Sequence, residues 1–194
     1  MNSGENIFNA FEVIKKTHES INKFITYCES IAPGSGFIKV PQRFLRYNSD
    51  PNPWGWSYSN IVQLFQKETD NEFGEHGWRD GPIYVLEINL YTPDFYDIPM
   101  VNISKYEYID ITSIAGPCGA GYIGIFVDPM FDNKKLEPPK KKNEREYDRK
   151  VVNTDERKWW SLNRIVGFSI PLTDITSKNA NEIIFDGFKS LETK

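Results

Sequence analysis

The chain contains few of the residues that build metal centres and disulfide frameworks. Its 194 residues include two cysteines, Cys28 and Cys118, and two histidines, His18 and His76. Two cysteines exclude a disulfide-rich secreted scaffold and a zinc site made of three or four thiolates. We therefore expect no cofactor and no metal, and the low cysteine content is typical of a reducing compartment.

Long apolar runs and a strong net charge are also missing. No stretch approaches the roughly 20 apolar residues of a membrane span, and the first twelve residues lack the basic and apolar regions of a secretory signal. The formal net charge of −4 is mild, whereas nucleic-acid binders are usually basic. These observations predict a soluble, cytoplasmic protein that has no membrane partner and for which a nucleic-acid partner is not favoured.

The strongest periodic signal is an apolar stripe in the first 32 residues. Its positions follow one another at alternating spacings of four and three, which is the repeat of one helix face: Ile7, Phe11, Ile14, His18, Ile21, Ile25, Cys28 and Ala32. Phe8, Phe24 and Ile31 widen this stripe beyond a two-helix seam. The pattern predicts a long helix that packs against a sheet, with a helix-mediated homodimer as the alternative.

The rest of the chain reads mainly as strands, with a short helix in the middle and another at the end. Strands are predicted near residues 37–40, 83–91, 101–112, 122–127 and 164–170, and helices from about 57 or 59 to 67 and from about 177 onward. Consecutive strands favour antiparallel pairing. We therefore predict a single α+β domain over residues 1–194, with a mostly antiparallel sheet of about five to six strands.

A charged segment interrupts this pattern near the C-terminal end of the strand region. Residues 134–150 contain eight Lys or Arg and four Asp or Glu, and Pro138-Pro139 lies among them. Few apolar residues are present to anchor the segment in a core. We predict an exposed loop or hairpin insertion at about 132–150.

One loop and the strand after it contain the residues best suited to catalysis. If the chain is an enzyme, the candidates are Glu75, His76, Asp80 and Glu87, which could form an acid–base pair or, together with Glu72, a carboxylate and histidine metal site. Their spacing matches no established set of metal ligands. An acidic surface loop is the simpler interpretation.

Aromatic and basic residues are the candidates for binding. Tryptophan side chains anchor many interfaces, and Lys and Arg side chains can contact acidic surfaces or phosphates. The candidate binding residues are Trp54, Trp56, Trp78, Arg79, Lys140, Lys141 and Lys142. The sequence thus favours a non-catalytic intracellular protein-interaction module that binds another macromolecule, including a second copy of itself. A small hydrolase using the Glu72–Glu87 segment is the second hypothesis, and nucleic-acid binding through the basic segment is the third.

Overall fold

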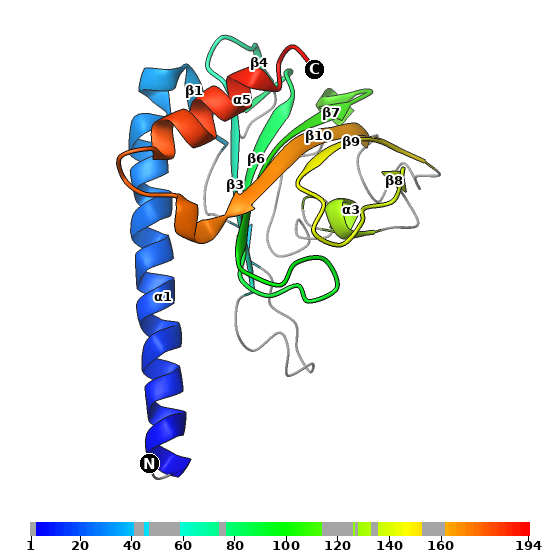
Figure 1. Ribbon diagram of the computed structural model, residues 1–194. Coiled ribbons are helices and arrows are strands. Elements are labelled where there is room, and N and C mark those ends of the chain that lie inside the picture. The colour runs from blue at the N-terminus through cyan, green and yellow to red at the C-terminus, as the bar shows by residue number, and fades with distance from the viewer. Residues whose placement is uncertain are drawn as a thin grey trace.

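The computed structural model describes residues 3–40, 45–46, 59–73, 77–113, 126, 128–132, 136–152 and 162–194. The chain begins with the helix α1 (Ser3–Ile31), which lies along one side of the sheet and extends well past it (Figure 1). The helix ends at the short 3-10 turn η1 (Pro33–Ser35), where Gly36 adopts φ 85°, a left-handed conformation that favours glycine. The predicted N-terminal helix is confirmed.

An antiparallel sheet forms the centre of the fold. Its described strands number eight, more than the five to six predicted, and seven of them follow the order β1-β3-β6-β7-β10-β9-β8, while β2 pairs with β3. The strands are β1 (Phe37–Lys39), β2 (Leu45–Arg46), β3 (Asn60–Lys67), β6 (Ile83–Asn89), β7 (Met100–Tyr108), β8 (Leu136–Glu137), β9 (Glu146–Val151) and β10 (Leu162–Pro171). A separate hairpin joins β4 (Glu72–Phe73) and β5 (Trp78–Arg79).

One sheet face is covered by the second half of α1 and by the C-terminal helical segment. That segment contains η5 (Leu172–Asp174), the π-helical turn η6 (Glu182–Asp186) and α5 (Gly187–Ser190). Side chains from both helical elements and from β1, β3, β6, β7 and β10 form one apolar cluster. In it the rings of Phe65, Phe185 and Phe188 lie with centroids 5.4–5.8 Å apart, the usual range for aromatic pairs.

The other sheet face is covered by the β4–β5 hairpin, by η3 (Ile111–Ser113) and by α3 (Asp128–Phe131), and Leu136 of the edge strand β8 joins the same apolar cluster. Trp78, Phe126, Met130 and Leu136 pack there against Val62, Val85 and Ile165 of the sheet. The central strand β6 is buried along its whole length. Both faces of the sheet are therefore covered at this strand, although one of its faces carries Glu87 and Asn89.

The predicted helix near residues 57–67 is wrong, because residues 60–67 form the strand β3. Both faces of β3 are covered, so the strand carries a nearly continuous run of buried residues rather than an alternating pattern. Such a run is ambiguous between a buried helix and a buried strand. The short middle helix of the described chain is α3 instead.

The charged segment contributes the paired strands β8 and β9 to the sheet. Residues 146–151 form β9, which pairs with β10, and Lys140, Tyr147 and Arg149 are buried. Of the described residues 136–150, four are buried (Leu136, Lys140, Tyr147 and Arg149), Glu144 is half-buried, and the others are exposed. Among the described helices, none combines the length and apolar character that a membrane crossing requires.

Candidate functional site

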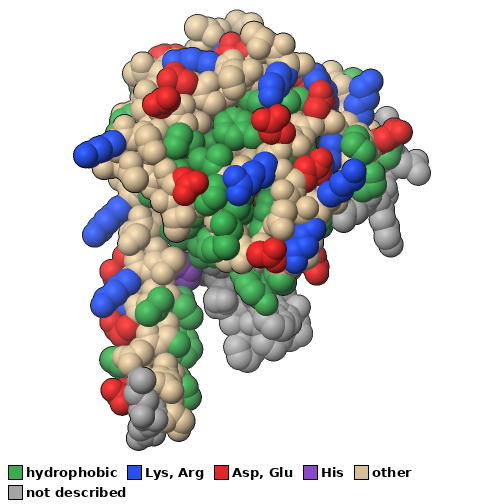
Figure 2. Space-filling model, viewed as in Figure 1, with side chains coloured by type: hydrophobic (Ala, Val, Ile, Leu, Met, Phe, Trp, Pro, Cys, Tyr) green, Lys and Arg blue, Asp and Glu red, His purple; other side chains and the backbone are tan. Residues whose placement is uncertain are grey.

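The first half of α1 exposes an apolar surface that the rest of the described chain does not cover. Ile7, Phe8, Phe11 and Ile14 are 61%, 65%, 68% and 40% exposed. We call these four residues the projecting stripe. Three turns further along the same helix face, Ile25 is 2% exposed. One continuous helix face therefore packs against the body at one end and faces solvent at the other (Figure 2).

The polar residues beside the projecting stripe are distributed unevenly along the helix. Glu12 and Lys15 follow Phe8 by four and seven residues, which places both on the same flank of the stripe as Phe8. Ala10 and Thr17, seven residues apart, lie on the opposite flank. One flank is therefore charged with both signs, and the other is small and uncharged.

A groove lies where α1 meets the C-terminal part of the chain. It has a volume of about 740 Å³ and is lined by Val13, Phe24 and Tyr27 of the helix and by Leu172 and Ile175 of the facing segment, among others. The Tyr27 hydroxyl donates a hydrogen bond to the Ser177 carbonyl across the groove at 3.3 Å. The groove is mostly apolar, and Val13, which is 63% exposed, brings it close to the projecting stripe.

A buried polar network occupies the sheet face opposite α1, with Glu87 of β6 at its centre. The Asn60 amide donates to one carboxylate oxygen at 3.0 Å, and the Asn102 amide donates to the other at 2.6 Å. Burial raises the pKa of Glu87 to about 7, although these two amides and the Lys140 ammonium lower it. Ser169 and Tyr96 extend the network by donating to the side-chain amide oxygen (Oδ1) of Asn102 at 2.6 and 3.1 Å.

The cationic end of this network is buried as well. The Lys140 ammonium lies 4.9 Å from the ring centroid of Tyr96 and 4.7 Å from that of Tyr147. Burial lowers its pKa to about 8. Arg149 donates to the Pro138 carbonyl at 2.7 Å and forms an ion pair with Glu144. A small cavity of about 300 Å³ beside Tyr96 is lined by Asp97, Met100 and Arg145, among others.

The carboxylate of Glu87 has the pKa of an acid–base group, but its described partners are structural amides. Within the described ranges no cluster of three or more His, Cys, Asp or Glu side chains could hold a metal ion. Burial raises the pKa of the Cys28 thiol to about 12, so this thiol stays protonated at neutral pH. The network is therefore best explained as a structural feature that holds the packed strands β6, β7 and β10 together.

Of the catalytic residues proposed from the sequence, the structure describes Asp80 and Glu87, and these two belong to different hydrogen-bond networks. Asp80 accepts hydrogen bonds from the backbone and side-chain amides of Asn71, both at 2.9 Å, and so closes the β4–β5 hairpin. Glu87 instead lies in the network on β6. Glu75 and His76 lie outside the described residues.

The described members of the proposed binding set differ in their burial and contacts. Trp78 is 1% exposed and belongs to the core, and the Arg79 guanidinium donates to the Asp70 carbonyl at 2.5 Å. Lys140 is buried, so it does not form a continuous basic surface with its two neighbours. The Lys141 backbone amide donates to Glu144, and the Lys142 ammonium pairs with Asp97 at 2.7 Å. Trp54 and Trp56 lie outside the described residues.

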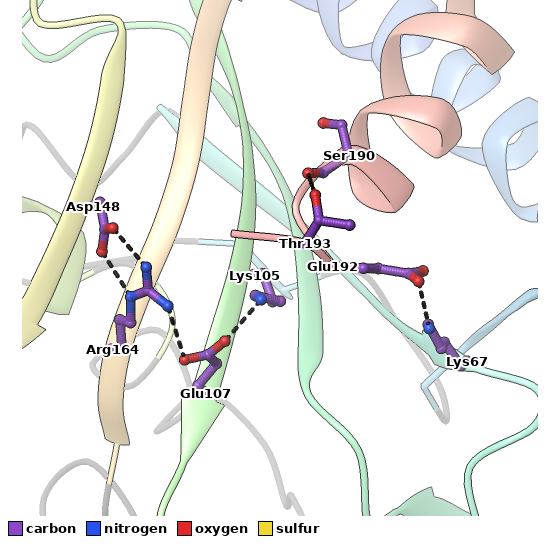
Figure 3. Close-up of polar contacts among 8 residues, drawn as sticks. All are labelled: Lys67, Lys105, Glu107, Asp148, Arg164, Ser190, Glu192 and Thr193. Atoms are coloured by element: carbon purple, nitrogen blue, oxygen red, sulfur yellow. Dashed lines mark hydrogen bonds and ion pairs between the residues drawn. The ribbon is translucent and has the colours of Figure 1, made fainter.

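A chain of charged side chains crosses the outer strands on the face that carries the helices. Arg164 of β10 donates to Asp148 of β9 at 2.7 and 2.5 Å and lies 3.7 Å from Glu107 of β7 (Figure 3). Glu107 pairs in turn with Lys105 at 2.7 Å. Lys67 and Glu192 form a separate pair at 2.7 Å, which ties β3 to the C-terminus. These contacts are consistent with cross-strand stabilisation.

Sequence reasoning missed the residues that surround Glu87. Asn60, Asn102 and Ser169 lie in strands whose other residues are largely apolar, and polar residues at such positions indicate a buried hydrogen-bonded network.

Comparisons of the chain with protein-family models, with curated proteins and with solved structures found no match. Its function is therefore inferred from its own residues.

Proposed function

We propose that this chain is a non-catalytic protein-interaction module whose binding surface is the projecting stripe of α1. The observation that carries the proposal is the contrast within one helix: Phe11 is 68% exposed, whereas Ile25 is 2% exposed. Burying each large apolar side chain of the stripe against a partner would contribute about 1.5–3 kcal/mol. A cluster of exposed apolar side chains of this kind marks an interaction site in soluble proteins.

The groove beside α1 supports the same proposal. Its apolar lining continues the exposed surface from Val13 toward Phe24 and Leu172. A partner that packs along the helix could therefore also reach the body of the molecule. Anchors that fill such a pocket usually contribute most of the binding energy.

Site-specific photocrosslinking in cells that naturally produce the chain tests this function. A photoreactive phenylalanine analogue at position 8 is expected to give covalent protein adducts. The same analogue at Asn9, an exposed position on the opposite side of the helix that does not line the groove, is the matched control and is expected to give few adducts. Absence of adducts at position 8, or equal yields at both positions, would contradict the proposal.

The hydrolase hypothesis has one supporting observation, the pKa of about 7 at Glu87. Thermal stabilisation by Mn²⁺, Mg²⁺ or Zn²⁺ that is lost in Glu87→Gln would favour it. If no ion shifts the unfolding temperature, the metal-dependent form of this hypothesis is excluded.

A further inference from the structure

We infer that the projecting stripe is covered by the same stripe of a second copy of this chain, with the two α1 helices antiparallel. This inference rests on the proposed function and names its partner. The exposed segment runs from the first turn of α1 to about His18, roughly 24 Å at 1.5 Å per residue. Because it projects past the sheet (Figure 1), two copies can overlap along it while their bodies lie at opposite ends.

Apart from Phe8, which lies on one flank, the projecting stripe has the spacing of a two-helix seam over this short length. Ile7, Phe11, Ile14 and His18 follow one another at spacings of four, three and four, the repeat that a helix pair uses for its core layers. In the antiparallel arrangement the central layers place Phe11 of each copy beside Ile14 of the other. In one copy Phe11 is 68% exposed and Ile14 is 40% exposed, so both side chains are available to form these layers.

The charges beside the stripe decide the orientation. A twofold axis perpendicular to two antiparallel helices brings like flanks together, so the flank carrying Glu12 and Lys15 meets the same flank of the second copy. Each Glu12 then lies toward the Lys15 of the other copy, which gives two opposite-charge pairs. In a parallel pair this flank would instead face the flank with Ala10 and Thr17, which has no charge to match it.

Light scattering after size-exclusion chromatography, over a series of protein concentrations, tests the identity of the partner. The wild-type chain is expected to reach the mass of two copies. Phe11→Glu is expected to remain at the mass of one copy. At a concentration where both chains are monomeric its unfolding temperature should match the wild type, because Phe11 is 68% exposed and belongs to neither apolar cluster of the described residues. Asn9→Glu, on the opposite side of the helix and outside the groove, is the matched control and should still dimerise.

A wild-type chain with the mass of one copy at every concentration would overturn the inference, and so would a dimer that Phe11→Glu leaves intact. In that case photocrosslinked adducts between position 8 and a different protein would leave the proposed function standing. If those adducts are also missing, both proposals fail.

Disulfide trapping tests the orientation. Ala10→Cys and Thr17→Cys lie on the same flank, and antiparallel helices bring these two positions together across the pair. A mixture of the two variants under mild oxidation is therefore expected to give several-fold more covalent dimer than either variant alone or the wild type. Equal yields in the mixture and in the separate variants would overturn the antiparallel arrangement.

Discussion

Helix α1 and strand β6 depart from the usual distribution of residues in opposite ways. The first half of α1 carries large apolar side chains that face solvent, whereas β6 carries Glu87 and Asn89 on a face that is fully buried. In both elements the periodicity correctly indicates the type of structure and which residues share a face. What covers that face depends on distant parts of the chain, or on another chain.

The largest expected difference is between the two halves of α1. Ile25→Glu places an unpaired charge in the core and is expected to lower the free energy of unfolding by about 4 kcal/mol or more. Phe11→Glu on the projecting stripe should change it by less than about 0.5 kcal/mol. Chemical denaturation at a protein concentration low enough to keep the chain monomeric measures both, and similar losses would show that the first half of α1 is packed in solution.

The next effect concerns the buried carboxylate of β6. The pKa of Glu87 is about 7 in the folded chain and near 4.5 in the unfolded chain, so between these values the folded state keeps a proton that the unfolded state releases. The contribution of Glu87 to stability is therefore complete below about pH 4.5 and falls by roughly 3 kcal/mol as the pH rises to about 7. Unfolding free energies of the wild type and Glu87→Gln over this range should diverge, and parallel pH profiles would contradict the burial of this group.

A smaller effect tests how closely the polar network face is packed. A Cβ atom at Gly167 of β10 would lie 2.5 Å from the Ile103 carbonyl oxygen and 2.6 Å from the Tyr147 hydroxyl. Gly167→Ala is therefore expected to destabilise the fold by about 1–3 kcal/mol through overpacking. Gly34→Ala is the control, because a Cβ there meets nothing within 4 Å. Equal unfolding midpoints for the two variants would show that β9 and β10 are loosely packed.

The smallest effect is expected at the exposed ion pairs on the sheet face that carries the helices. Asp148→Asn removes the carboxylate that accepts both hydrogen bonds from Arg164, but the Asp148 side chain is 56% exposed. Screening by solvent limits the loss to less than about 1 kcal/mol. Thermal unfolding at low and high salt should show a small difference that salt reduces, and a loss as large as that of Ile25→Glu would mean that this network is buried in a larger assembly.

The sequence predicted the α+β architecture because its longest elements have clear periodicity. The stripe of α1 and the C-terminal positions Ala180, Ile184, Phe188 and Leu191 follow helical spacing, and all four C-terminal side chains are fully buried. Strand β3 was missed because burial on both faces removes the alternation that identifies a strand. The buried polar network was missed because Asn60 and Asn102 meet Glu87, and Ser169 meets Asn102, only through the pairing of separate strands.

The candidate site was predicted only in part. The alternative of a helix-mediated dimer followed from the repeat in α1, but the repeat does not show which half is left uncovered. That depends on where the sheet ends, which is a property of the tertiary structure. The proposed catalytic loop was chosen from local composition, and Asp80 instead stabilises the hairpin through Asn71.

Hydrogen exchange along α1, followed at increasing protein concentration, tests the central claim most directly. Helices without tertiary contacts open readily, so the amides of residues 5–16 should exchange fast in the monomer, whereas those of residues 21–31 are protected by the core. Self-association through the projecting stripe predicts that protection of residues 5–16 rises with concentration while that of residues 21–31 stays constant. Exchange of residues 5–16 that remains fast at every concentration would contradict it.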